Sequence, residues 1–286
     1  MQNYNNNNGR NNFNRPRPNQ NSNRNQNNQQ QITIIKCYPQ DTSNLVKSEQ
    51  VKNLNIKYQK LIELKINNKI EIEKKILKES VNIQFNSKLE LPNLDKIEMI
   101  AETRPKLIIG LGSESVYEIS LTLHHVYGVP YIPGSALKGS FRSFIIKKYF
   151  ENNEKEALTD AKFRSIFGGN EQQEKQESNS EKGNIVFFDS FPEGSVAVVV
   201  DILTPHYNNY YQHQNPPTDT ENPNPVSFLS VEGKFRIIIG IKENCDSILL
   251  GKPKKEFLKE ELKDMLENFG VGAKTAVGYG YFKIVG

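Results

Sequence analysis

The chain has 286 residues, and its 37 Lys and Arg residues against 33 Asp and Glu residues give a formal net charge of +4. It has no run of 18 apolar residues and no apolar stretch at its N-terminus, so we expect neither a membrane span nor a signal peptide. The two cysteines, Cys37 and Cys245, lack a CxxC neighbour, which argues against a thiolate zinc site and favours a reducing, cytoplasmic compartment.

Residues 1–31 form a separate segment with 14 Asn, 6 Gln and 4 Arg residues, and with no Lys or acidic residue. Such a segment has too little apolar surface to offset its ordering entropy, so we predict a disordered tail. Its arginines could form an RNA-binding arm, or the tail could be a neutral extension that reflects the Asn-rich composition of the whole chain. Because the tail holds the entire charge surplus, residues 32–286 carry no net charge.

Apolar periodicity predicts the elements that follow the tail. Leu54 and Tyr58 lie at helical spacing and predict a helix over residues 44–66. Ile97 and its apolar neighbours again fall on one helical face, so helices are expected within residues 70–103. Strands are predicted at residues 32–38, 106–112 and 116–126.

Residues 127–149 contain a loop followed by a helix. Pro130 and Pro133 prevent a regular strand, and Ser135 is a good N-cap for an apolar stripe of 3.6 periodicity that runs to Tyr149. We therefore predict a helix over residues 135–149.

The start of this helix is a candidate anion site. Its free N–H groups and the positive end of its dipole would face an anion near Gly134 and Ser135, and Lys138 and Arg142 lie one turn apart beside them. The alternative is an ordinary solvated helix face, which is the more common role of an isolated Lys and Arg pair.

The second half of the chain is predicted to be richer in strands. A helix at 156–167 is followed by a polar segment at 170–183 that we expect to be mobile, and a long proline-rich loop spans residues 206–226, with Pro205 just before it. A helix at 255–268 precedes a glycine-rich turn and a terminal strand. The strands expected between these elements lie at residues 185–189, 196–203 and 228–241.

The glycine-rich turn near the C-terminus is a second candidate site. Glycine lets a ligand approach main-chain N–H groups, so the pattern suits phosphate binding, but neither a P-loop nor a dinucleotide fingerprint fits because a helix precedes the turn. A helix cap at Gly270 with a bulge near the final strand explains the pattern equally well. The residues concerned are Gly270, Gly272, Lys274, Thr275, Gly278 and Gly280.

Two aromatic residues after this turn resemble a base-stacking strand. Tyr279 and Tyr281 share one strand face and could stack on bases, as aromatic side chains do in RNA recognition motifs. A core role is favoured, because the pattern lies at the end of the chain and lacks its basic first residue.

Catalytic motifs are weak in this sequence. It has no HExxH, no GxSxG and no compact group of three carboxylates. His124 and His125 are adjacent at a predicted strand end, so they are expected on opposite faces. Asp201 and His206 could form a general acid and base pair, although a structural role for Asp201 is favoured.

Four segments together resemble the RAMP superfamily of CRISPR proteins, and within it the family of sixth RAMP subunits of the type III-B, or Cmr, effector complex. The resemblance covers about residues 104–145 and 185–286. The segments are KLIIGLGSESVYEISLTLHHVYGVPYIPGSALKGSFR, FFDSFP, VVDILTPHYNNYY with NPVSFLSV after it, and NFGVGAKTAVGYGYF.

The resemblance implies an α+β fold with a ferredoxin-like, RRM-like βαββαβ core, helical insertions and no cofactor. It implies a non-catalytic subunit of an antiviral complex that binds guide RNA near its 3′ end and caps a filament of subunits. Its expected partners are guide RNA, target RNA, and the other RAMP and small helical subunits. The alternative is a RAMP endoribonuclease that uses His206 with Asp201, or His124.

The family's RNA-binding residues carry over onto matching positions of this sequence. The loop and helix that face RNA match Gly134, Ser135, Lys138 and Arg142, and the glycine-rich loop matches the residues from Gly270 to Gly280 named above. Asp201, His206 and Tyr207 match a feature whose role is expected to be RNA or subunit contact. The resemblance assigns no catalytic residue and no metal ligand, and it does not extend to residues 1–31 or 170–183.

Overall fold

The computed structural model describes most of the chain after residue 32. The residues described are 33–45, 51–61, 63–67, 69–72, 81–85, 95–113, 120–169, 181–204, 225–242, 248–249 and 252–286. The predicted tail at 1–31 and residues 170–180 of the polar segment lie outside these ranges.

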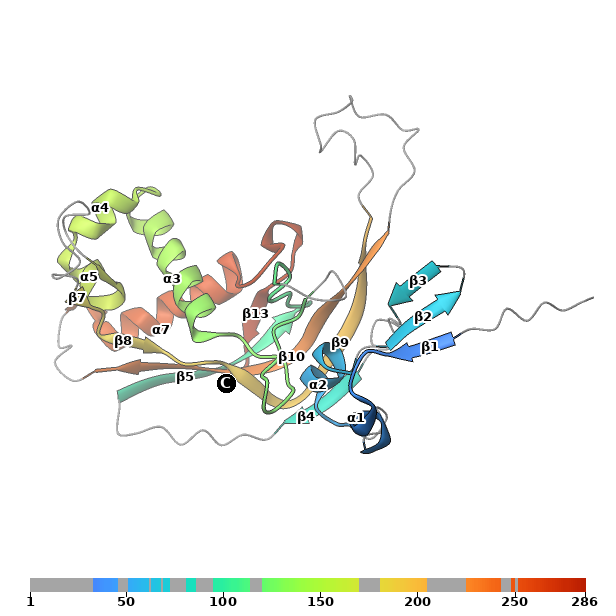
Figure 1. Ribbon diagram of the computed structural model, residues 1–286. Helices are drawn as coiled ribbons and strands as arrows, with labels where there is room; N and C mark the ends of the chain where they lie inside the picture. Colours follow the sequence, from blue (N-terminus) through green and yellow to red (C-terminus); the bar gives the residue numbers. More distant parts are fainter. Residues whose placement is uncertain are drawn as a thin grey trace, which may run out of the picture.

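A six-stranded antiparallel sheet forms the centre of the described structure (Figure 1). Five strands follow the order β13-β5-β10-β9-β4, and β8 pairs with the end of β10 that β9 leaves uncovered. The strands are β4 (Val81–Phe85), β5 (Asp95–Arg104), β8 (Ile185–Phe187), β9 (Phe191–Leu203), β10 (Val226–Ile241) and β13 (Tyr281–Ile284). The strands predicted at 185–189, 196–203, 228–241 and the C-terminus are thus confirmed.

Strand β5 replaces helices that the sequence led us to expect. Ile97, Met99 and Ala101 are buried while the residues between them are more exposed, which is the two-residue period of a strand. The helical spacing of the same apolar residues was misleading because β5 lies between β10 and β13, and this pairing decides its backbone conformation.

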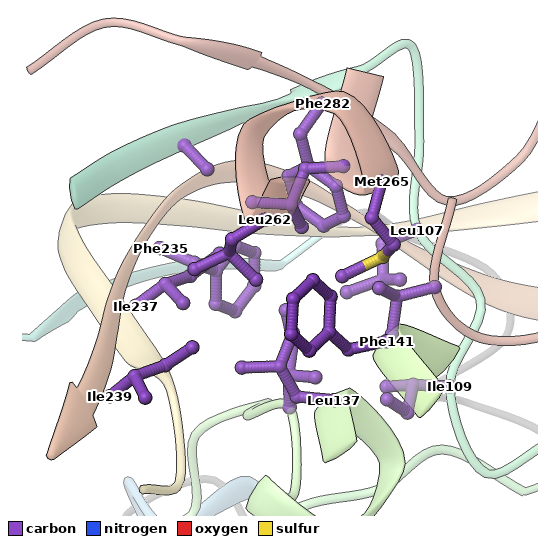
Figure 2. Packing of buried hydrophobic residues seen from close by; sticks show 14 of the residues in the cluster. Leu107, Ile109, Leu137, Phe141, Phe235, Ile237, Ile239, Leu262, Met265 and Phe282 are labelled. Carbon is purple, nitrogen blue, oxygen red and sulfur yellow. The ribbon is translucent and has the colours of Figure 1, made fainter. Parts of the chain in front are cut away.

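Two helical segments pack on one face of the sheet. They are α3 (Gly134–Tyr149), and α7 (Lys254–Asp264) with a π-helical last turn at Met265–Phe269. Figure 2 shows Leu137 and Phe141 of α3 and Leu262 of α7 packed against Phe235 and Ile237 of β10. Both predicted helices are confirmed, because each carries an apolar stripe at helical spacing.

An ion-pair network joins α3 to α7 at the surface of this layer. Lys148 Nζ lies 2.7 Å from Glu261 Oε2 and 2.6 Å from Asp264 Oδ2, and the Tyr149 hydroxyl donates to Glu261 Oε1 at 2.7 Å. Burial, and then the Glu261 carboxylate, raise the pKa of Tyr149 to about 12, so its hydroxyl stays protonated. The network fixes the two helices relative to each other.

The helix predicted over residues 156–167 is interrupted at Asp160. The structure has two short helices, α4 (Glu154–Thr159) and α5 (Ala161–Phe167). The Asp160 carboxylate accepts a hydrogen bond from the Phe163 main-chain N–H at 2.7 Å, so it caps the second helix.

The N-terminal region has its own three-stranded sheet in the order β1-β2-β3. A strand in the region of 32–38 is confirmed. The helix predicted over 44–66 is wrong in its length: of its described residues, only Leu54–Gln59 form a helix in its centre, and residues 63–67 form a strand that pairs with β1 and β3. The elements are β1 (Thr33–Lys36), α1 (Gln40–Leu45), α2 (Leu54–Gln59), β2 (Glu63–Asn67) and β3 (Lys69–Ile72).

The strands predicted at 106–112 and 116–126 are not regular strands where the structure describes them. Leu107, Ile108 and Ile109 are buried as expected, but the segment makes only one bridge, from Leu107 to Val231. Leu123 bridges Pro130 across a tight turn, because the chain reverses instead of continuing as a strand.

The remaining elements are short. Two small hairpins pair β6 (Gly168–Gly169) with β7 (Glu181–Lys182) and β11 (Ile248–Leu249) with β12 (Lys252–Pro253), and a 3-10 turn spans Thr275–Val277. Within the described ranges, no helix has the length and apolar character needed to cross a membrane.

Candidate functional site

The N-terminus of α3 already faces a carboxylate. Pro133, and not Ser135 as predicted, occupies the N-cap position, and it provides no side-chain cap. The main-chain N–H of Gly134 instead donates to Asp189 Oδ1 at 2.7 Å, while Ser135 is exposed in the first turn. The Asp189 carboxylate thus already satisfies part of the attraction that the helix start offers to an anion, and binding of an external anion there stays a prediction.

The two cations predicted beside this helix start differ in their surroundings. Lys138 is half-buried and has no ion-pair partner among the described residues. Arg142 Nη2 lies 2.8 Å from Glu154 Oε1, and its guanidinium carbon is 5.4 Å from the ring centre of Phe163. Lys138 is thus available to a phosphate, whereas Arg142 would first have to leave Glu154.

The glycine-rich turn is docked on residues 106–108 by main-chain hydrogen bonds. Ala273 donates to the Ile108 carbonyl at 2.9 Å, and Gly280 donates to the Lys106 carbonyl at 2.8 Å. Gly280 has φ of 76°, and a Cβ there would lie 2.0 Å from the Val271 carbonyl oxygen, so no other residue fits.

The other members of the glycine-rich turn divide into two groups. Gly270 ends the helical segment with its N–H bonded to Met265, and Gly272 packs close to the Ile108 carbonyl, so both have structural roles. Lys274, Thr275 and Gly278 belong to a more accessible turn. Lys274 has no ion-pair partner among the described residues, and it is the cation that this turn can offer to a ligand.

Asp201 is the centre of a polar network beside the glycine-rich turn. Lys106 Nζ lies 3.1 Å from its carboxylate, the Tyr279 hydroxyl donates at 2.8 Å, and the Ile202 main-chain N–H donates at 3.0 Å. Burial tends to raise the pKa of Asp201, but these hydrogen bonds and the charge of Lys106 outweigh it and lower the pKa below its ordinary value. Asp201 is thus an ionised group that ties β9 to the turn.

Tyr279 takes part in the packing of this region. Its ring meets Phe228 edge to face with 6.0 Å between the ring centres, and its hydroxyl is bonded to Asp201. This arrangement agrees with the core role favoured from the sequence. His206 and Tyr207, which were predicted beside Asp201, lie outside the described residues.

His124 and His125 lie on the same side of the chain, contrary to the sequence prediction. Their ring centres are 5.0 Å apart with an angle of 23° between the planes, because residues 124–128 form a turn instead of a strand end. Burial, and then the charge of His125, lower the pKa of His124. Its Nδ1 accepts a hydrogen bond from the Tyr127 main-chain N–H at 3.3 Å, which places the proton of the neutral ring on Nε2.

Sequence reasoning missed an aromatic cluster around this turn. Its rings come from the end of β4, the turn and the start of β9. Each ring centre lies within 6 Å of the centre of at least one other ring in the cluster. The density of rings in HHVYGVPY was the available signal, but the predicted strand concealed it. The aromatic cluster consists of Phe85, His124, His125, Tyr127, Tyr131 and Phe191.

Metal ligands are not gathered in the part of the chain that the structure describes, where no three His, Cys, Asp or Glu side chains are close enough to hold an ion. Asp201 has Lys106 and Tyr279 as its neighbours, and Asp189 faces the start of α3. The described residues offer hydrogen-bonding groups, charges and aromatic rings to a ligand.

Two proteins of known family have similar sequences. The Cmr subunit Cmr6 of the CRISPR system of Pyrococcus furiosus is 32% identical, over 63% of this chain and 65% of its own length. The Cmr6 subunit of Saccharolobus solfataricus is 29% identical, over 64% of this chain and 55% of its own length. The chain thus spans less than two thirds of either relative.

Two solved structures and one family model match parts of this chain. A chain in the cryo-EM structure of the type III-B Cmr-beta complex bound to cognate target RNA has a TM-score of 0.46 at 23% identity, over 67% of this chain and 58% of its own. The crystal structure of Cmr6 from Pyrococcus furiosus has a TM-score of 0.38 at 30% identity, over 68% of this chain and 100% of its own. The family model of the RAMP superfamily matches residues 100–283. This match covers more than half of the sequence, and the chain belongs to the RAMP superfamily.

Proposed function

We propose that this chain is a non-catalytic, RNA-binding backbone subunit of a type III-B CRISPR ribonucleoprotein. In this role it contacts the guide RNA near its 3′ end and caps the filament of subunits in antiviral defence. The observation that carries the proposal is the 32% identity to a Cmr6 subunit, together with membership of the RAMP superfamily. Its partners would be guide RNA, target RNA, and the other RAMP and small helical subunits of the complex.

The order of elements supports a ferredoxin-like, RRM-like core. The main elements follow one another as β5, α3, β8 with β9, β10, α7 and β13. This is the order of a βαββαβ fold if β8 and β9, which both pair with β10, together count as its second strand. The first and third strands, β5 and β10, lie at the centre, and β13 lies on the outer side of β5. Sheets of this type bind RNA in several modules.

Two lysines are the best candidates for phosphate contacts. Lys138 lies in the second turn of α3, and Lys274 lies in the turn before β13, with no ion-pair partner in the described ranges. Contacts to phosphates carry no base information, so they support affinity that depends on salt and not on sequence. This suits a subunit that must hold guides of any sequence.

The surroundings of Asp201 and His124 favour a non-catalytic role for these two residues. A general base works best with a pKa near the working pH, whereas the pKa of Asp201 is lowered by its hydrogen bonds from Tyr279 and Lys106. His124 lies within the aromatic cluster with Nδ1 occupied. The endoribonuclease alternative is tested by incubating the purified chain with guide precursor and target RNA, with and without Mg²⁺. Cleavage that is lost in His206→Ala, His124→Ala or Asp201→Ala would contradict the proposal.

The RNA-binding role is tested by charge removal. We expect Lys138→Ala and Lys274→Ala each to weaken binding of single-stranded guide RNA, and each to reduce the slope of log affinity against log salt by about 0.7. Filter binding or fluorescence anisotropy at several salt concentrations measures both quantities. Lys259→Ala removes an exposed lysine from α7 and serves as the control. The proposal is wrong if the wild-type chain, alone and in the assembled complex, shows no affinity for RNA.

A further inference from the structure

Three rings of the aromatic cluster form a continuous stack. The ring centre of His124 lies 5.0 Å from that of His125 and 4.6 Å from that of Tyr127, and the planes differ by only 23° and 19°. The two outer rings are accessible, because Tyr127 is 53% exposed and His125 is also an exposed residue. Adjoining apolar side chains that stay exposed together can mark a binding site.

The stack rests on a second layer of rings. Phe191 stacks with Tyr131 at 5.7 Å and with Phe85 at 5.6 Å, and it meets the edge of His124 at 5.4 Å. Phe85 and Phe191 belong to β4 and β9, so the sheet supports the exposed rings.

The backbone of the turn is fixed before any ligand binds. Gly128 N–H donates to the His124 carbonyl at 2.7 Å, and the side-chain amide of Asn53 donates to the carbonyls of Val126 at 2.8 Å and His125 at 3.2 Å. A ligand that stacks here therefore meets rings that are already placed, and little ordering entropy is lost on binding.

The stack lies close to the start of α3, the helix that carries Lys138. Ile132, two residues before Gly134, forms a β-bridge with Ser190. The neighbouring Asp189 accepts the hydrogen bond from Gly134 N–H, and its charge also acts on the pKa of His124.

We propose that the His125, His124 and Tyr127 stack is a platform on which an unpaired RNA base stacks. The inference rests on the proposed RNA-binding function and assigns it a base contact in addition to phosphate contacts. Planar rings with polar edges on exposed residues suit a nucleobase, and stacking accepts any base because every base has a π-face. Burial lowers the pKa of His124, which keeps the middle ring neutral at neutral pH.

The platform is tested by removing one exposed ring. The full chain is titrated with fluorescein-labelled oligouridine RNA, and binding is followed by anisotropy. Tyr127→Ala should weaken binding about tenfold, since loss of one base-stacking contact costs about 1 to 3 kcal/mol. Tyr127→Phe keeps the ring and should bind within about twofold of the wild type. Val126→Ala, at an apolar position that is 61% exposed in the same turn, should also leave binding unchanged.

A second probe separates base stacking from phosphate contact. An oligonucleotide with abasic riboses keeps every phosphate, so Tyr127→Ala should not weaken its binding further. If the wild type binds oligouridine and Tyr127→Ala binds it equally well, the platform is overturned but the RNA-binding function is not. Tyr127→Ala that impairs assembly with partner subunits, with RNA affinity unchanged, would also overturn it and assign the rings to a protein contact. An absence of salt-dependent RNA affinity in the wild type would contradict both proposals.

Discussion

Asp189 accepts a hydrogen bond from the main-chain N–H of Gly134, with 2.7 Å between the carboxylate oxygen and the nitrogen. The two residues are 55 positions apart, and the bond joins the segment between β8 and β9 to the first turn of α3. Since the carboxylate stands at the positive end of the helix dipole, it supplies the cap that Ser135 was expected to provide.

Removal of the Asp189 carboxylate should destabilise the fold moderately. Asp189→Ala loses both the cap and the charge, and it should lower the free energy of unfolding by about 1 to 2 kcal/mol. Asp189→Asn keeps an acceptor and should lose only about 0.5 kcal/mol. Urea denaturation followed by circular dichroism measures both values.

The same substitutions have an electrostatic readout at His124. Asp189 raises the pKa of His124, so both variants should lower that pKa further, as NMR titration of the ring protons would show. Glu193→Gln removes an exposed carboxylate from β9 and is the control for general charge effects. Equal stability of all three variants and the wild type would contradict a capping role for Asp189.

Release of Arg142 from Glu154 should strengthen RNA binding. The guanidinium is held at 2.8 Å from the Glu154 carboxylate, and an exposed ion pair of this kind contributes only up to about 1 kcal/mol to stability. Glu154→Gln should therefore leave the fold nearly as stable, increase the affinity for guide RNA a few fold at low salt, and steepen the salt dependence.

The control for this prediction is Glu156→Gln, which removes a neighbouring exposed carboxylate of α4. If Glu154→Gln and Glu156→Gln increase RNA affinity equally, the effect comes from net charge alone, and Arg142 has no special role.

Gly280 should tolerate substitution far less than Gly278. A Cβ at Gly280 would overlap the Val271 carbonyl oxygen, so Gly280→Ala should cost about 3 kcal/mol or more. Gly278 also has positive φ, but nothing lies within 4 Å of a Cβ there, so Gly278→Ala should cost only about 1 to 2 kcal/mol. Chemical denaturation of both variants tests the difference, and equal losses would argue against the tight approach of Gly280 to Val271.

Asp201 should make stability depend on acid pH. Its pKa in the folded chain is below the ordinary value of 3.8, so the ionised form is stabilised by folding. This contribution is present in full well above pH 4 and is lost as the pH falls through the lowered folded pKa. Asp201→Asn should thus be less stable than the wild type at pH 7, and the difference should shrink towards pH 3.

Other carboxylates also titrate in this range, so the measured quantity is the difference between the two proteins in urea denaturation at each pH. Tyr279→Phe removes one hydrogen bond to Asp201 and should show part of the same dependence. A difference between wild type and Asp201→Asn that is constant from pH 7 to pH 3 would contradict the network.

Local patterns in the sequence were sufficient to predict those helices and strands whose conformation is set by the spacing of their own apolar residues. The apolar stripes of α3 and α7 are continuous, and the β-branched runs of β9 and β10 have no competing helical pattern, so these elements were predicted close to their observed bounds. The four motif segments pointed to the RAMP superfamily before any tertiary contact was known. The neutrality of residues 32–286 likewise follows from composition alone.

Only the tertiary structure decided which of the candidate groups are available. Whether residues 95–104 form a helix or a strand depends on β10 and β13, which are far away in sequence. Arg142 and Lys138 look alike in the sequence, but only Arg142 has a carboxylate beside it among the described residues. His125, His124 and Tyr127 form a stack because the chain turns there, and Phe191 of a distant strand packs against the His124 ring. Such relationships depend on contacts between distant segments, which local propensity does not encode.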